Sequence, residues 1–241
     1  MYFTKIFLRD ATPELNQVYY RVMKRALIFS NGNLANIYKL KEFIKSSDFI
    51  ICADGGIKYA LKAKLKPDVI IGDLDSVPKS LIKKLERQKV NFKKFSREKD
   101  WTDFELAVNL ALDKGFKELL ILGFLGDRVD HLFSSLFFLA KKFLETQGLE
   151  IKIIEGNQEI FFIRDSILLT GEKGSHLSLI PIGDVKGINS VGLYYPLKDD
   201  SLFFGTTRGV SNVFISSRVS LKVKEGVLLA ILEKENPHSK K

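Results

Sequence analysis

Cysteine is nearly absent from this chain, since Cys52 is the one cysteine in 241 residues. A single thiol cannot form an intramolecular disulfide, so the sequence excludes a disulfide framework and is typical of a reducing cytoplasm. Long apolar runs are also missing, because none approaches the roughly 20 residues that a membrane-spanning helix needs. We therefore expect a cytoplasmic protein without a membrane partner.

Several common catalytic motifs are missing as well. No glycine-rich loop ending in Lys-Ser or Lys-Thr is present, which argues against a P-loop enzyme. No cluster of Cys and His has the spacing of zinc ligands, and no Gly-x-Ser-x-Gly elbow supports a serine nucleophile. These absences argue against a P-loop enzyme, a zinc site of Cys and His, and a serine hydrolase.

The composition is that of a globular protein with a core, 45% hydrophobic and 28% charged. The formal net charge of +9 favours a polyanionic partner, either a nucleic acid or a smaller nucleotide. Many lysines lie in short runs on expected solvated faces, and no Arg-rich arm or aromatic RNA-binding motif accompanies them. We therefore expect no nucleic-acid partner.

Strand and helix patterns alternate through residues 23–155, which predicts a doubly wound, mostly parallel, Rossmann-like α/β domain. Residues 1–22 fit this pattern badly, and we expect them to be an N-terminal extension. Residues 156–241 carry short β-rich segments separated by turns, which predicts an all-β sandwich domain or an open barrel. The expected strands include His176–Ile180, Asp184–Val191 and Val213–Val219. Two predictions can be checked locally: a helix from about residue 33 to Lys45, and a capping box of Thr102 with Glu105 that begins another helix.

Two carboxylates, Asp73 and Asp75, follow the apolar run Pro67–Ile71 and lie within the sequence Gly-Asp-Leu-Asp-Ser. Two acids at a strand end repel each other and need a cation or a shared proton between them. Oxygen ligands beside a phosphate site suit Mg²⁺, although an acidic turn is a simple alternative.

Four groups of polar or glycine residues each follow a predicted strand of the first half. Parallel strands share one direction, so the loops after them converge on one sheet edge, where ligands bind in open α/β folds. Each group alone could be a turn, a helix cap or a surface position, and their convergence is what favours a site. The groups are Asp54, Gly55 and Gly56; Asp73 and Asp75; Asp100 and Asp103; and Gly123, Gly126, Arg128, Asp130 and His131.

The residue types in these groups suit a phosphate-bearing ligand. Glycines let backbone amides approach phosphate oxygens, and Arg128 could bind such an oxygen with its planar fork. Several acids and one Arg at a phosphate-sized crevice favour phosphoryl-type transfer assisted by metal ions.

These motifs resemble those of the thiamine pyrophosphokinase family, in order and with compatible spacing from about residue 25 to residue 233. The acidic motif is shared with related pyrophosphokinases, and its combination with the late Ser-Asn motif is more specific. The family often has an acid after that Ser-Asn, where this chain has Val213. Beyond the four groups, the matching stretches include Trp101-Thr102, Gly192-Leu193-Tyr194-Tyr195-Pro196-Leu197 and Arg208-Gly209-Val210-Ser211-Asn212.

The resemblance implies transfer of the β,γ-pyrophosphoryl group of ATP to the hydroxyethyl oxygen of thiamine, with release of AMP. It also implies a homodimer whose active site combines the nucleotide domain of one subunit with the β domain of the other. The implied roles are Mg²⁺ binding by Asp73, Asp75 and Asp100, with Asp103 close by; ATP binding by Asp54, Gly55, Gly56, Gly123, Gly126, Arg128, Asp130 and His131; and thiamine binding by Ser211 and Asn212.

Two alternatives to this reading remain at the sequence level. A pyrophosphokinase could act on another heterocyclic alcohol such as a hydroxymethylpterin, although the β-rich second half with its Ser-Asn motif argues against it. A nucleotide or thiamine sensor could keep the pocket without catalysis, although such a protein could lose the acids freely.

Overall fold

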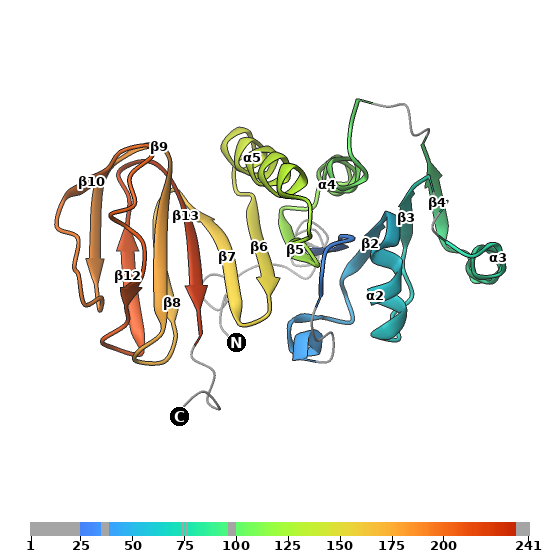
Figure 1. Ribbon diagram of the computed structural model, residues 1–241, viewed down its shortest axis with the longest axis horizontal. Coiled ribbons are helices and arrows are strands. Elements are labelled where there is room, and N and C mark those ends of the chain that lie inside the picture. The colour runs from blue at the N-terminus through green and yellow to red at the C-terminus, as the bar shows by residue number, and fades with distance from the viewer. Residues whose placement is uncertain (1–24, 35–38, 74, 76, 96–99, 235–241) are drawn as a thin grey trace, which may run out of the picture.

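The computed structural model describes residues 25–34, 39–73, 75, 77–95 and 100–234. One sheet runs through this part of the chain, with the strand order β4-β3-β2-β1-β5-β6-β7-β13-β9-β12-β8 (Figure 1). The strands from β4 to β6 are parallel, and those beyond β6 are antiparallel. The parallel strands are β1 (Arg25–Phe29), β2 (Phe49–Ala53), β3 (Val69–Gly72), β4 (Asn91–Lys94), β5 (Glu118–Leu122) and β6 (Glu150–Glu155).

Helices cover both faces of the parallel part, which explains why its central strands are almost wholly apolar and buried. Helices α4 (Asp103–Asp113) and α5 (Val129–Glu145) lie on one face, with α2 (Ile57–Lys62) and α3 (Lys79–Arg87) on the other (Figure 1). Each face has its own apolar core, because alternate residues of each strand point to opposite sides. Short 3₁₀ helices span Lys39–Phe43 and Asp54–Gly56.

The strand order reverses between β1 and β5. From β1 the chain proceeds outward through β2, β3 and β4, and it then returns to the other side of β1 with β5 and β6. The carboxyl ends of β1 and β5 therefore flank a topological switch point, where open α/β sheets bind ligands.

The second half continues the same sheet through β7, which forms an antiparallel hairpin with β6. A third core lies between β7, β13 and the first part of β9 on one side, and β8, β12 and the rest of β9 on the other. The strands are β7 (Gln158–Ile163), β8 (Ser166–Thr170), β9 (His176–Val191), β10 (Asp200–Leu202), β11 (Asn212–Val213), β12 (Arg218–Lys222) and β13 (Glu225–Glu233).

The mixed α/β architecture predicted from the sequence is confirmed, with differences in detail. The segments expected at His176–Ile180 and Asp184–Val191 form one strand, because Gly183 and Gly187 adopt positive φ and let β9 bend without ending. The strand expected at Val213–Val219 is wrong, since β11 ends at Val213 and β12 begins at Arg218.

The helix predicted from about residue 33 to Lys45 is largely wrong where it can be checked, since only the 3₁₀ helix Lys39–Phe43 occurs there. Residues 35–38 of that segment, and the predicted extension 1–22, lie outside the described residues. No helix in the described part of the chain is long and apolar enough to span a membrane.

Candidate active site at the carboxyl edge of the parallel sheet

The loops after β1 and β5 are joined by backbone hydrogen bonds at the switch point. The Gly32 amide donates to the Gly123 carbonyl at 2.8 Å, and the Asn33 amide donates to the Leu125 carbonyl at 2.6 Å. A Cβ on Gly32 would lie 2.3 Å from the Leu125 oxygen, so only glycine fits this approach. The Asn33 side chain also donates to Asp127 at 2.7 Å. One of the four groups expected to converge, the loop after β5, therefore lies against the loop after β1, which was not among those groups.

The loop after β2 packs against its neighbours on both sides. Asp54 has a φ of +44°, which is unusual for a residue with a side chain, and its carboxylate accepts a hydrogen bond from Asn31 at 3.1 Å. A Cβ on Gly56 would lie 2.2 Å from the Phe29 carbonyl oxygen. A Cβ on Gly72 would lie 3.2 Å from Cα of Asp54. The loops after β1, β2 and β3 therefore touch in sequence along one edge.

Asp73 and Asp75 directly follow β3, as predicted. The Asp75 amide donates to Oδ1 of Asp73 at 3.0 Å, which fixes the first carboxylate above the strand end. Asp73 is half-buried and Asp75 is exposed. Both carboxylates can therefore meet a ligand from solvent.

The capping box predicted before α4 is confirmed. The Glu105 amide donates to the Thr102 hydroxyl at 3.2 Å, and the Thr102 amide donates to the Glu105 carboxylate at 2.8 Å. Asp103 is the first residue of α4 and is half-buried, whereas Asp100 is exposed before the cap. This cap sets where the acidic loop ends and the helix begins.

Arg128 and Asp130 lie at the start of α5 and bind each other. The guanidinium donates to the two carboxylate oxygens at 3.2 and 2.5 Å. This hydrogen bonding raises the pKa of Arg128 and lowers the pKa of Asp130, and both side chains are exposed. His131 follows them and is exposed too. Arg128 is thus available to a ligand that can compete with Asp130.

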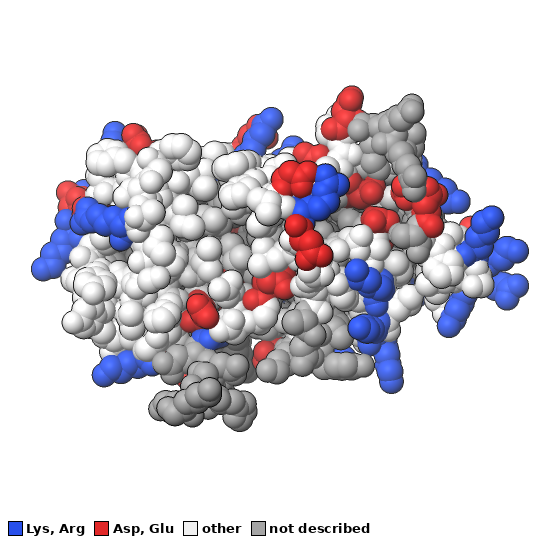
Figure 2. All heavy atoms as spheres, viewed as in Figure 1, with Lys and Arg blue, Asp and Glu red and all other residues white. Residues whose placement is uncertain are grey.

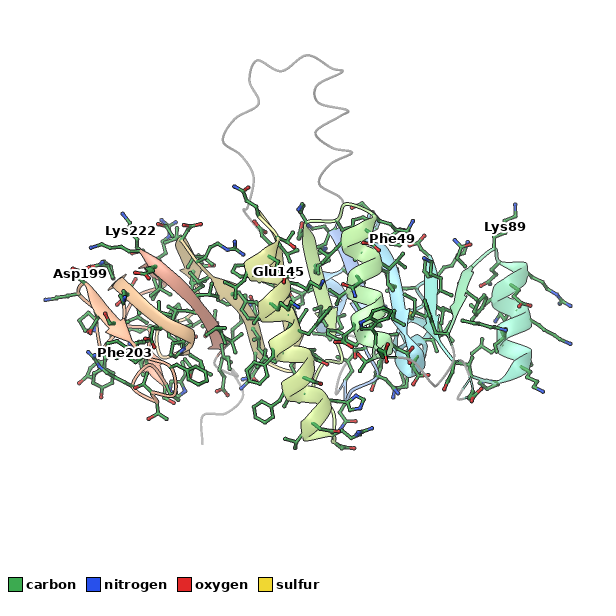
Figure 3. The ribbon with its side chains drawn as sticks, turned by 90° about the horizontal axis from the view of Figure 1, so that it is seen from above. Phe49, Lys89, Glu145, Asp199, Phe203 and Lys222 are labelled. Carbon is green, nitrogen blue, oxygen red and sulfur yellow. The ribbon has the colours of Figure 1, made fainter. Side chains whose placement is uncertain are left out.

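The figures show how these groups lie together. In Figure 3, Phe49 at the start of β2 and Glu145 at the end of α5 lie on the same side of the molecule. The end of β2 and the start of α5 therefore lie together on the other side. Figure 2 shows acidic side chains gathered on the viewer's face over the ends of the parallel strands and the start of α5. A basic side chain lies among them. Among the residues that the structure describes, this surface is mainly acidic.

The carboxylates of this surface are ligands of the type that magnesium prefers, because the ion is bound by carboxylate and water oxygens. Within the residues that the structure describes, no three His, Cys, Asp or Glu side chains lie close enough to hold a metal ion together. Cys52 is no candidate ligand or nucleophile here, since burial and the nearby Asp68 raise the pKa of its thiol and it lies inside β2.

Glu155 is a site residue that the sequence reasoning missed. It ends β6, and its carboxylate accepts a hydrogen bond from the Leu125 amide at 3.4 Å. Burial raises the pKa of Glu155, and its hydrogen bonds to the amides of Leu125 and Phe124 oppose that rise only in part. The loop after β5 is therefore held by the loop after β1 on one side and by Glu155 on the other.

In the second half, Asn212 uses its side chain to hold the chain at Tyr195. Its amide oxygen accepts from the Tyr195 amide at 3.0 Å, and its nitrogen donates to the Tyr195 carbonyl at 2.7 Å. Asn212 is 6% exposed, whereas Ser211 is exposed with a φ of +58°. Tyr194 and Tyr195 are each 63% exposed, and their rings pack edge to face with 4.8 Å between the ring centroids. The late motif thus presents Ser211 and two aromatic rings to solvent.

Family models match both halves of the chain. The model of the thiamin pyrophosphokinase catalytic domain matches residues 40–153, and that of the thiamin pyrophosphokinase vitamin B1 binding domain matches residues 165–228. Thiamine pyrophosphokinase from Bacillus subtilis (strain 168) is 28% identical over 212 residues, covering 87% of this chain and 98% of the relative. Thiamin pyrophosphokinase 1 from Caenorhabditis elegans is 26% identical over 229 residues, covering 87% and 89%.

Solved structures show the same fold. The crystal structure of the Bacillus subtilis thiamine pyrophosphokinase has a TM-score of 0.78 at 24% identity, covering 88% of this chain and 100% of that one. The yeast thiamin pyrophosphokinase structure has a TM-score of 0.69 at 21% identity, covering 88% and 86%.

Proposed function

We propose that this chain, which belongs to the thiamine pyrophosphokinase family, transfers the β,γ-pyrophosphoryl group of ATP to the hydroxyethyl oxygen of thiamine. The products are thiamine diphosphate and AMP. The observation that carries the proposal is the contact between the loops after β1, β2, β3 and β5 along the carboxyl edge of the parallel sheet, most of which lies within the region that matches the catalytic-domain model.

The nucleotide binds, in this proposal, at the carboxyl edge of the parallel sheet. The glycines let backbone amides approach the phosphates. Arg128 releases Asp130 and binds a phosphate oxygen instead, because the planar guanidinium binds carboxylates and phosphates with the same geometry. The residues assigned to the ATP site are Asp54, Gly55, Gly56, Gly123, Gly126, Arg128, Asp130 and His131.

Asp73, Asp75 and Asp100 would hold Mg²⁺, with Asp103 close by. Because no three carboxylates cluster among the described residues, phosphate and water oxygens would supply the remaining ligands. When bound, the ion would neutralise charge on the transferring phosphates. The thiamine hydroxyl attacks the β-phosphorus as the bond from that phosphorus to the α-phosphate oxygen breaks, and AMP leaves. We assign Asp100 as the acceptor of the hydroxyl proton. Positioning of the two substrates supplies most of the acceleration.

Thiamine binds through the second half, with Ser211 beside the pyrimidine and Asn212 holding the segment that carries Tyr194 and Tyr195. In Figure 1 the strands β9, β10 and β12 lie at the opposite end of the molecule from β2 and β3. This separation supports a homodimer in which residues 156–241, as a β-sandwich domain, complete the Rossmann-like ATP-binding domain 23–155 of the other subunit. We propose a cytoplasmic location, because the cytoplasm supplies ATP and its reducing conditions suit the single thiol of Cys52.

Product identification tests the function. The purified full chain is incubated with Mg²⁺, thiamine and ATP labelled in the β-phosphate, and the products are separated and weighed by mass spectrometry. We expect labelled thiamine diphosphate and AMP in equal amounts. Release of ADP would contradict transfer of the pyrophosphoryl group as a unit, and transfer to a hydroxymethylpterin in preference to thiamine would contradict the acceptor.

A further inference from the structure

Lys58, at the second residue of α2, meets the loop after β1 at the edge of the nucleotide site. Its ammonium group donates a hydrogen bond to the Asn31 side-chain oxygen at 3.0 Å. The nitrogen of the same Asn31 amide donates to the Asp54 carboxylate at 3.1 Å. One side chain from the β1 loop therefore bridges a cation and an anion that both follow β2.

The position of Asn31 is fixed by its surroundings. A Cβ on Gly55 would lie 2.3 Å from the Asn31 side-chain oxygen, so this amide packs directly on the Gly55 backbone. Asp54, which accepts its other hydrogen bond, adopts a positive φ beside the Gly72 backbone. The point to which the Lys58 ammonium is anchored is thus built by three loops, which limits where a long flexible side chain can place its charge.

The charge of Lys58 is not cancelled by direct contact. In the described part of the chain its ammonium forms no ion pair: its hydrogen-bond partner is an uncharged amide oxygen, and it lies 4.7 Å from the centroid of the uncharged Tyr59 ring. Arg128, by contrast, binds both oxygens of Asp130. A triphosphate bound beside Asp54, Asp73 and Asp75 needs cations nearby, because like charges repel strongly where water is displaced.

We infer that Lys58 is a phosphate-binding residue of the nucleotide site and that Asn31 positions it. The inference rests on the proposed function, because it takes the nucleotide to lie at this edge of the sheet. The alternative is a surface lysine whose contact with Asn31 has no effect on ligands. The two readings differ in how binding depends on the number of phosphates.

Titration calorimetry of the full chain with ATP and with AMP, each with Mg²⁺ and without thiamine, separates them. Lys58→Met should weaken ATP binding about tenfold or more, as loss of a charge-assisted contact does, while AMP binding changes less than about twofold. Lys58→Arg should recover most of the ATP affinity. The matched control is Lys62→Met, an exposed lysine one turn later on the same helix, which should bind both nucleotides as the wild type does.

Unchanged ATP affinity in Lys58→Met would overturn the inference, and so would an equal loss of ATP and AMP affinity. Either result leaves the proposed function standing if the wild type still converts thiamine and ATP to thiamine diphosphate and AMP. Absence of both ATP and AMP binding by the wild type would contradict the proposed function itself.

Discussion

At the residue scale, Glu159 shows how charge is kept in a buried position. The residue is 8% exposed, and it accepts a hydrogen bond from Lys152 at 2.7 Å and pairs with Lys234. Burial alone would raise the pKa of Glu159, but the two ammonium groups outweigh burial and lower it. A carboxylate with a lowered folded-state pKa stabilises the fold above its ordinary pKa, and this contribution is lost as pH falls through the folded-state pKa.

Glu159→Gln should therefore lower the free energy of unfolding by about 1–2 kcal/mol at pH 7, and the difference from wild type should shrink at about pH 3.5. Thermal melts of both proteins at the two pH values measure this. Glu145→Gln is the control, because its pair with Lys141 spans 3.8 Å between exposed side chains and should contribute little. A difference that stays constant with pH would show that the ion pairs are not its source.

At the element scale, the loop between β5 and α5 depends on the end of β6. Glu155→Ala removes the acceptor for the Leu125 amide and should raise the KM for ATP about three- to tenfold with a smaller change in kcat. Glu155→Gln keeps an acceptor oxygen and should restore most of the loss. Steady-state kinetics provide the measurement.

Glu150→Ala is the matched control for that series, because Glu150 begins the same strand, and burial raises its pKa as well. Glu150 lies at the opposite end of β6 from the site, so the KM of Glu150→Ala for ATP should equal that of the wild type. An equal rise of the KM for ATP in Glu150→Ala and Glu155→Ala would show that Glu155 acts on the stability of the fold and not on the nucleotide site.

The sequence predicts much of this edge and misses its internal contacts. Strand-end loops could be placed together because parallel strands share a direction, and the Thr102 cap follows a known local pattern. Asn31 and Glu155 read as an ordinary turn residue and an ordinary acid, because their partners are far away in sequence. Only the register of β1 against β2 and of β5 against β6 brings those partners within reach.

At the scale of the whole molecule, the two halves share a core as well as a sheet. Residues of α5 pack with residues of β7 and β13, and the rings of Phe143 and Phe162 stack at 5.3 Å between centroids. The sequence pattern alone showed a change of texture after Gly156 but not this shared packing, which depends on the third dimension.

Scanning calorimetry should consequently show one unfolding transition with equal calorimetric and van't Hoff enthalpies. Phe162→Ala should move the whole transition to lower temperature, since loss of a buried ring costs about 3–5 kcal/mol. Two resolved transitions, with only one moved by Phe162→Ala, would mean that the halves unfold independently.

The central claim is that the acidic residues at the carboxyl edge of the parallel sheet carry out the transfer. Its most direct test is the rate of Mg²⁺-dependent AMP formation from ATP and thiamine by the wild type, Asp73→Asn and the control Asp113→Asn. Asparagine keeps the oxygen that accepts the Asp75 amide, so Asp73→Asn should fold normally and lose on the order of 100-fold or more in kcat. Asp113, exposed at the far end of α4, should tolerate the same change. Near-normal AMP formation by Asp73→Asn would contradict the account.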